Sequence, residues 1–223
     1  MGNRICWSNC FRRTFESKYF ILVLFFLIIA LRFMNLDADP SFVKRLGDIS
    51  DEGVWGTDPR NAVLFGDWWV GDLHLGLNSN PLYMYFLYIS FKFFGVSISS
   101  LRLVSAISGV LTAILIYLLM KKTVGRNHAV FSVMIYGLGN APIMYNRLGL
   151  TESLLSLFLL LTFFTWILGE KNKSFYLISG VCFGLAFLSK FTALFFFPAL
   201  LLYWFYEYLK GRLRFSQVFL YLI

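Results

Sequence analysis

LRLVSAISGVLTAILIYLLM, residues 101–120, is an apolar run of 20 residues whose only charge is Arg102, at its second position. Lys121 and Lys122 follow it directly. A helix needs roughly 20 apolar residues to cross the hydrocarbon core of a bilayer, and this run meets that length. The stretch therefore predicts a transmembrane helix, and similar runs on either side of it predict an all-α integral membrane protein.

The composition of the whole chain agrees with this fold class. Hydrophobic residues make up 58% of the chain and charged residues only 14%, whereas a soluble domain carries about 25% charged residues. The formal net charge is +8, but the Lys and Arg residues punctuate the apolar runs and form no basic stripe of the kind that binds nucleic acid. We therefore interpret them as topology signals and expect no nucleic-acid partner.

Six apolar runs are candidates for membrane spans. The first, from Tyr19 to about Leu36, follows a basic segment, 1–18, that we expect to be a cytoplasmic tail. A signal peptide is the alternative, but the run is too long for one and lacks a small-residue cleavage site. Gly180 and Gly184 in the fifth run are expected to allow close helix packing. The predicted spans are 19–36, 101–120, 128–145, 153–169, 175–189 and 191–209.

The segment 37–100 holds eight of the twelve acidic residues and is expected to be an extracytoplasmic loop with two helices lying along the membrane. One is 81–95, for which Asn80 is a suitable N-cap and Pro81 a suitable first-turn residue. If 81–95 crossed the bilayer, eight of the 20 Lys and Arg residues would lie inside, whereas a flat helix puts twelve inside. The positive-inside rule favours the flat helix, with its tyrosine hydroxyls in water. The other helix is expected to open with Thr57 as N-cap and to run to about Trp69.

This topology gathers six charged residues on the outer surface: Asp51, Glu52, Arg102, Arg147, Glu152 and Lys190. Ionisable groups at membrane depth cost roughly 2.5–3.5 kcal/mol on insertion scales and usually face a partner or a functional site. Simpler interpretations stay open. They are arginines that reach to lipid phosphates, a Glu152 that favours a helix N-terminus, a Lys190 that anchors a turn, and acids at 51 and 52 that are only solvated loop charges.

Short motifs follow one another in a fixed order over residues 18–210. They are Asp51-Glu52-Gly53, Arg60-Asn61-Ala62, Gly66-Asp67-Trp68, Asn80-Pro81-Leu82-Tyr83, Leu101-Arg102-Leu103, Asn146-Arg147-Leu148, Glu152-Ser153-Leu154 and Gly184-Leu185-Ala186-Phe187-Leu188-Ser189-Lys190. This ordered set resembles the N-terminal half of a GT-C glycosyltransferase. The resemblance is to the branch that includes protein O-mannosyltransferases and the aminoarabinose transferases that modify lipid A.

The resemblance implies transfer of a sugar, with inversion, from a polyprenyl-phosphate donor to a hydroxyl of a protein, lipid or glycan. Asp51 falls on the family's catalytic acid, and Glu52 and Glu152 would assist it. Expected substrate-binding residues are Arg102, Arg147, Lys190, Asn80 and Tyr83. Carboxylate oxygens also suit hard divalent ions, so one Mg²⁺ or Mn²⁺ is a candidate cofactor, with Asp51 and Glu152 as candidate ligands. Many members carry an acid and a Lys where this chain has Ser79 and Asn80.

Two other functions stay open from the sequence. A transporter of lipid-linked sugars would place charges through the bilayer midplane or carry paired repeats, and neither pattern is visible here. A non-catalytic membrane subunit is the other alternative. The chain stops within an apolar run, so 211–223 is expected to begin a further segment. A fragment, a truncated product and a minimal module are all compatible with that ending.

Overall fold

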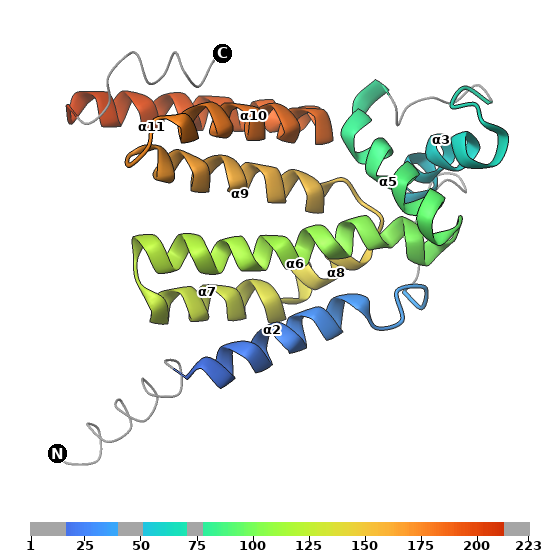
Figure 1. Ribbon diagram of the computed structural model, residues 1–223, viewed down its shortest axis with the longest axis horizontal. Helices are drawn as coiled ribbons and strands as arrows, with labels where there is room; N and C mark the ends of the chain where they lie inside the picture. The colour runs from blue at the N-terminus through green and yellow to red at the C-terminus, as the bar shows by residue number, and fades with distance from the viewer. Residues whose placement is uncertain (1–16, 40–50, 71–77, 212–223) are drawn as a thin grey trace.

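The computed structural model describes residues 17–39, 51–70 and 78–211 of the chain (Figure 1). These residues form helices and turns, and no strand occurs among them. The expected tail, 1–18, and final segment, 211–223, lie almost wholly outside the described residues. The all-helical prediction is confirmed for the described part of the chain.

Most helices run side by side across Figure 1 as a bundle. Helix α6 packs against α7 and α9, and α9 packs along α10. These bundle elements are α2 (Lys18–Phe33), α6 (Ile98–Thr123), α7 (Arg126–Leu138), α8 (Asn140–Arg147), α9 (Glu152–Gly169), α10 (Ser174–Ser189), the 3₁₀ helix η1 (Phe191–Phe196) and α11 (Phe197–Leu209). By length and composition, α6 and α9 are able to cross a membrane, and α10 and Phe191–Tyr206 are shorter apolar helices. The count of six spans therefore stays a prediction.

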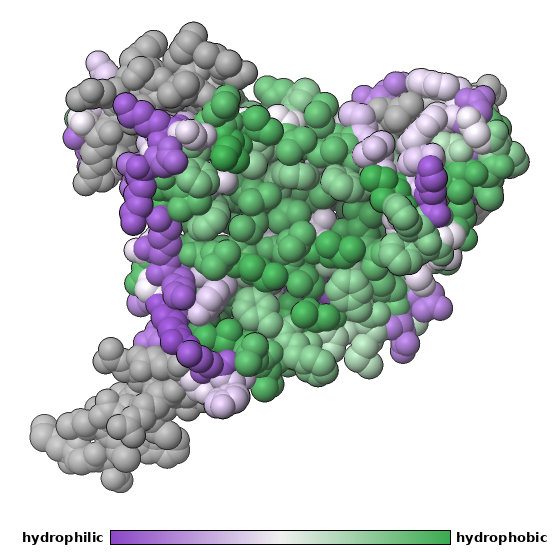
Figure 2. Space-filling view, in the orientation of Figure 1, coloured by the Kyte–Doolittle hydropathy of each residue, from purple (hydrophilic) through white to green (hydrophobic). Residues whose placement is uncertain are grey.

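The surface of the bundle is apolar in its middle and hydrophilic at its ends. Figure 2 shows a broad hydrophobic face, with hydrophilic residues along one edge and again around α3 and α5 at the other. Large apolar side chains such as Phe26, Ile135, Phe195 and Leu202 are exposed. A contiguous apolar surface of this size is unsuited to water and suited to lipid tails.

Two further helices, α3 (Asp51–Phe65) and α5 (Pro81–Phe94), lie at the end of the bundle where α6 and α9 begin (Figure 1). Helix α5 buries one stripe of side chains, at positions 83, 84, 87, 90 and 91. That spacing is typical of an amphipathic helix. Tyr83, Met84 and Leu87 pack on Leu115 of α6 and Leu154 of α9. Helix α5 is therefore attached to the bundle through its apolar face, while its orientation to a bilayer stays a prediction.

Sequence reasoning placed the start of α3 too late. The helix begins at Asp51, not at Thr57, so Asp51 and Glu52 lie in its first turn and not in a loop. Thr57 is an interior residue whose hydroxyl donates to the carbonyl of Gly53 at 2.6 Å. Acidic residues are favoured in a first helical turn by the helix dipole, and this signal was available at positions 51 and 52.

The predicted continuous span 128–145 is interrupted in the structure. Helix α7 ends at Leu138, Gly139 is extended, and α8 begins at Asn140. Pro142 is the cause visible in the sequence. A proline within a continuous helix would clash with the carbonyl four residues earlier, but it is tolerated in the first turn of α8. The predicted run 191–209 is similarly divided, into η1 and α11.

Two smaller expectations also fail. The hydroxyl of Tyr83 is not in water, because this side chain is fully buried. Gly184 does not mediate close packing, since a methyl group built on it would meet nothing within 4 Å among the described atoms.

Candidate active site

A buried ion pair joins α3 to α6 at the end of the bundle. Arg102 donates from Nε to Glu52 Oε1 at 2.8 Å and from Nη2 to Oε2 at 2.9 Å. The backbone N–H of Gly149 donates to the same Oε1 at 2.7 Å. Only 6% of the Glu52 side chain and none of the Arg102 side chain is exposed. A bidentate pair of this kind fixes both partners in position.

Arg102 also holds the chain that follows α2. Its Nη1 donates to the carbonyl oxygens of Leu36, at 2.6 Å, and Asp39, at 2.9 Å. Four N–H donors of this guanidinium are thus used within the protein. Arg102 connects α6, α3 and the end of the first apolar run, and these contacts are those of a residue that organises the site.

Arg147 has a similar set of partners at the C-terminal end of α2. Its Nη1 donates to the carbonyl oxygens of Leu31 and Met34, each at 2.8 Å, and its Nε donates to Asp39 Oδ2 at 2.5 Å. The last carbonyl groups of a helix lack partners within the helix and carry a partial negative charge. Arg147 therefore caps the C-terminus of α2, although it lies 116 positions after Leu31 in the sequence.

Glu152 and Lys190 form a second ion pair, which is partly open to solvent. Lys190 Nζ donates to Glu152 Oε1, and 39% of the Glu152 side chain and 23% of the Lys190 side chain are exposed. Glu152 is the first residue of α9, and Lys190 caps the C-terminus of α10. The chain thus brings together two ionisable groups that lie 38 positions apart in the sequence.

Asn80 and Tyr83 lie close to this second pair. With the Asn80 amide oriented to satisfy both of its groups, its nitrogen donates to the carbonyl of Ser189 at 3.1 Å. Asn80 occupies the N-cap position of α5, but its side chain does not cap that helix. Its amide instead joins the start of α5 to the end of α10, next to Lys190.

The Tyr83 phenol interacts electrostatically with the acids of both pairs. Its hydroxyl lies 3.2 Å from Ser105 Oγ, and Ser105 in turn donates to the carbonyl of Leu150 at 2.9 Å. Burial is the largest cause and raises the pKa of the Tyr83 phenol; the hydrogen bond with Ser105 opposes this rise, and the negative charges of Glu52 and Glu152 add smaller increases. Tyr83 is therefore held neutral, as a hydrogen-bonding group between two carboxylates.

Asp51 is half-buried in the first turn of α3, directly before the buried Glu52. Arg102 and Gly149 hold Glu52 in place. The backbone next to Asp51 is therefore anchored at Glu52. Of the predicted catalytic acids, Glu52 is buried, whereas Asp51 and Glu152 are partly accessible.

Sequence reasoning missed a buried arginine, Arg32, near the end of α2. It is fully buried and donates to Asn146 Oδ1 at 3.0 Å and to the carbonyls of Gly137, at 3.0 Å, and Tyr136, at 3.5 Å. The carbonyls at 136 and 137 belong to the last turn of α7, just before the break at Gly139. A charged residue within an otherwise apolar run is the signal that could have identified it.

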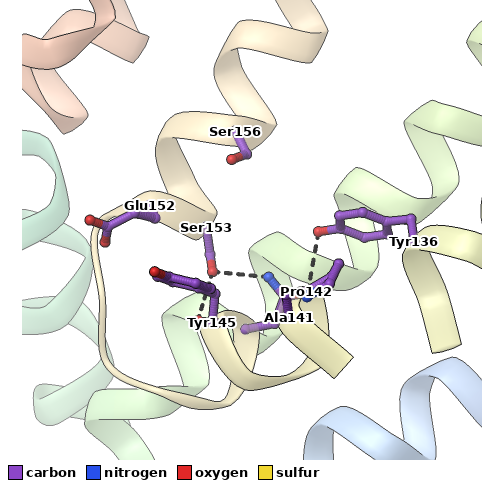
Figure 3. A pocket seen from close by; sticks show the side chains of 8 residues that line it. Tyr136, Ala141, Pro142, Tyr145, Glu152, Ser153 and Ser156 are labelled. Atoms are coloured by element: carbon purple, nitrogen blue, oxygen red, sulfur yellow. Dashed lines mark hydrogen bonds between the residues drawn. The ribbon is translucent and has the colours of Figure 1, made fainter. Parts of the chain in front are cut away.

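A pocket of about 350 Å³ lies beside Glu152, between the α7–α8 break and the first two turns of α9 (Figure 3). Its lining includes Tyr136, Tyr145, Asn146, Ser153 and Glu152. Asn146 Nδ2 donates to Ser153 Oγ at 3.0 Å, and Ser153 donates to the carbonyl of Tyr145 at 3.1 Å. The polar floor of the pocket is thus a connected network that begins at the buried Arg32.

Comparison with known proteins identifies the family. Residues 78–223 match the family described as dolichyl-phosphate-mannose-protein mannosyltransferase. The chain belongs to this family.

One curated relative is an uncharacterized protein from Aquifex aeolicus (strain VF5), which is 28% identical over 187 residues. The match covers 82% of this chain and 36% of that protein, so the chain spans about a third of its relative's length. No solved structure matches the chain.

The family match covers only part of the candidate site. It includes Tyr83, Arg102, Arg147, Glu152 and Lys190, whereas α3 with its two acids lies before residue 78. The expected GT-C relationship is confirmed, and with it the membership of a membrane glycosyltransferase family. The roles of individual residues stay predictions.

A divalent cation finds little support among the described side chains. No group of three His, Cys, Asp or Glu residues converges there in a way that could hold a metal ion. Of the two candidate ligands, Glu152 already has a cation beside it in Lys190. An ion bound at Glu152 would lie beside that ammonium group and be repelled by it, so the donor set fits a metal poorly, and the proposed reaction uses none.

Proposed function

We propose that this protein transfers a sugar from a polyprenyl-phosphate donor to a hydroxyl acceptor on the extracytoplasmic face of a membrane. The observation that carries the proposal is the Glu152–Lys190 pair. It is a partly exposed acid and a partly exposed cation at the end of an apolar bundle. The same bundle buries Arg32 and Arg102. Membership of the mannosyltransferase family supports the reaction class.

The chemistry assigns different tasks to the charged residues. The acceptor oxygen attacks the anomeric carbon, the bond from that carbon to the phosphate oxygen breaks, and the polyprenyl phosphate leaves with the bonding electrons. Lys190 meets the growing negative charge on the phosphate, because a cation aimed at charge that develops in the transition state lowers the barrier. Asp51 takes the acceptor proton as general base, and inversion follows from a single displacement.

Arg102, Arg147 and Tyr83 act without touching substrate in this proposal. Arg102 orients Glu52 and so the first turn of α3, Arg147 caps α2, and Tyr83 bonds to Ser105. The hydrogen bonds described above for these three side chains are made within the protein, and withdrawing the Arg102 guanidinium would leave the buried Glu52 carboxylate unpaired at a cost of several kcal/mol.

The direct test is transfer by the purified full-length protein in lipid nanodiscs, supplied with radiolabelled polyprenyl-phosphate mannose and a hydroxyl acceptor. Asp51→Asn keeps the size of the side chain and removes the base, so we expect transfer to fall by about 10²–10⁴. Asp67→Asn is the matched control, because Asp67 is an exposed acid just after the same helix and its carboxylate accepts from the backbone N–H of Trp69 at 2.8 Å. Equal transfer by the Asp51 and Asp67 variants would remove Asp51 from the mechanism.

The proposed orientation has its own test. In a variant without native cysteines, Tyr85→Cys should be labelled by an impermeant reagent added outside, and Lys122→Cys only after the membrane is opened. Both positions are exposed, so a difference reports the side of the membrane and not burial. The reverse pattern would contradict an extracytoplasmic site.

A further inference from the structure

The pocket beside Glu152 has aromatic walls and a polar floor. The rings of Tyr136 and Tyr145, with Pro142, supply apolar surface (Figure 3). Asn146 and Ser153 form the floor, and both are at least nine-tenths buried. A volume of about 350 Å³ is at the small end of the roughly 300–1,000 Å³ that small-ligand sites span.

Hydrogen bonds and close packing hold the polar floor of the pocket in a fixed arrangement. Asn146 is held by Arg32 at 3.0 Å and by the Tyr136 hydroxyl at 3.2 Å, both on its Oδ1. Gly109 of α6 leaves room for it, because a methyl group there would lie 2.3 Å from Asn146 Cγ. A buried, fully oriented amide at the base of an open pocket is a recognition element and not a gap in packing.

Two hydroxyl groups in the pocket remain available. Ser156 is exposed on the α9 side and Tyr145 is 41% exposed on the α8 side. Within the part of the chain that the structure describes, neither hydroxyl has a hydrogen-bond partner. Together with one Glu152 oxygen at the rim, they offer donors and acceptors to a ligand that carries several hydroxyl groups.

The charges that line the pocket are unfavourable to a phosphate. Glu152 is the one charged side chain in its lining, and the cations nearby are used elsewhere. Arg32 lies behind Asn146 and is fully buried, and Arg147 points to the end of α2. An anion in the pocket would meet the Glu152 carboxylate directly, whereas Lys190, which bonds to Glu152, is not part of the lining; this arrangement is unfavourable for an anion.

We propose that this pocket is the acceptor subsite and that the acceptor is a neutral saccharide. A sugar ring presents C–H faces that pack on tyrosine rings and hydroxyl groups that reach Ser156, Tyr145 and Glu152. An alkyl or prenyl chain would leave those polar groups without partners, which costs free energy when they are covered. The proposal rests on the proposed function, since it names the acceptor of that reaction, and Glu152 links the pocket to Lys190.

The test measures binding first, so that it does not depend on transfer. The probes are the methyl glycoside of mannose and, separately, a short uncharged peptide that contains serine. Saturation-transfer NMR on the full-length protein in nanodiscs reports whether either probe contacts protein protons. We expect signal from the glycoside, and a loss of at least about fivefold in Ala141→Trp, because Ala141 lines the pocket and is exposed.

The matched control is Ile135→Trp. Ile135 is 61% exposed on α7 and does not line the pocket, so the same bulky ring is added to the surface without filling the site. Glycoside signal that is equal in both variants would overturn the proposal. So would peptide signal that Ala141→Trp removes while the glycoside gives none, because the pocket would then belong to a protein acceptor.

The kinetic arm separates this proposal from the function on which it rests. With polyprenyl-phosphate mannose as donor, Ala141→Trp should raise KM for the glycoside acceptor about tenfold and leave KM for the donor unchanged. Equal rises in both KM values would contradict a separate acceptor subsite. If the wild-type protein binds the glycoside in the pocket but transfers nothing, the reaction is wrong and the site stands.

Discussion

Two carboxylate–cation pairs lie at the same end of this bundle, and they differ in nearly everything except their charges. Glu52–Arg102 has side chains that are 6% and 0% exposed, with both ends of the guanidinium bonded. Glu152–Lys190 has side chains that are 39% and 23% exposed, joined through one ammonium contact. The first pair connects three segments of the chain, whereas the second connects the ends of two neighbouring helices.

The difference indicates which pair can do chemistry. A buried ion pair whose arginine makes four hydrogen bonds within the protein holds structure, because removal of one partner leaves an uncompensated charge. A partly exposed pair stabilises the fold by little, and its groups can exchange one partner for another. Lys190 can therefore leave Glu152 for a phosphate at small cost, whereas Arg102 cannot leave Glu52 without losing the position of α3.

The largest effect should come from breaking the buried pair. Arg102→Met leaves the Glu52 carboxylate buried and unpaired, which costs about 3–5 kcal/mol. For a chain of this size that corresponds to a fall in Tm of about 6–20 °C, measured by thermal unfolding of the purified protein. Arg60→Met is the control, because Arg60 is exposed and donates to the side chain of the neighbouring Asn61, at 3.3 and 3.1 Å.

The double variant Glu52→Leu with Arg102→Met sharpens this prediction. With both charges removed, part of the lost stability should return, although the Gly149 N–H then loses its acceptor. A double variant less stable than Arg102→Met alone would show that the pair is not the source of the effect.

The accessible pair should show the opposite profile. Lys190→Met is expected to lower transfer by about 10²–10³, the usual loss when one transition-state charge donor is removed. Its Tm should change little, since a pair of this exposure contributes about 0–1 kcal/mol. Lys92→Met, at the exposed C-terminal end of α5, controls for loss of a surface lysine.

Two results would contradict the contrast between the buried pair and the accessible pair. One is unfolding of the protein by Lys190→Met, and the other is a transfer rate of Lys190→Met that matches that of Lys92→Met. In the first case both pairs would be structural. In the second, the accessible pair would have no part in the reaction, and the proposed role of Lys190 would be lost.

The positions of these pairs show how far sequence reasoning reaches. The apolar runs predicted the helices and which end of each would face the same side, so Arg102, Glu152 and Lys190 were correctly expected near one end. Which acid pairs with which cation was beyond reach, because it depends on side-chain directions across helices that are separated by up to 50 positions, as Glu52 and Arg102 are.

Arg32 shows the same limit more sharply. Its charge inside an apolar run was a visible signal, but its partners are backbone carbonyls at the end of α7. Those carbonyls are free only because the helix breaks at Gly139, and the break follows from Pro142. A prediction of one continuous span hides both the break and the reason for the arginine.

A glycine beside the buried pair should give an intermediate effect. A methyl group on Gly149 would lie 1.7 Å from Leu101 Cδ2 and 3.3 Å from Glu52 Oε1. Gly149→Ala must therefore displace the Leu101 side chain or the loop that bonds to Glu52, and overpacking of this kind costs about 1–3 kcal/mol. Thermal unfolding measures this loss of stability.

Gly184→Ala is the matched control, because the same methyl group meets nothing within 4 Å. It also replaces glycine in a helix, which is neutral or stabilising. Equal losses in the two variants would mean that Gly149 is not tightly packed.

The smallest effect should come from Tyr83, the residue between the two pairs. Tyr83→Phe removes one hydrogen bond to Ser105, which costs about 1 kcal/mol.

The wild-type phenol has a pKa raised by burial, so the folded state holds this proton more tightly than the unfolded state does. Its contribution is fully present below the unfolded pKa of about 10 and is lost as the pH rises further. The stability of the wild type should therefore fall more steeply than that of Tyr83→Phe above about pH 10. Unfolding midpoints measured from pH 8 to 11 test this, and the KM values at pH 7.5 provide the second readout. Unchanged KM values with a changed alkaline slope place Tyr83 in the support of the site. A donor KM that rises severalfold with no change in slope would place its hydroxyl on the substrate instead.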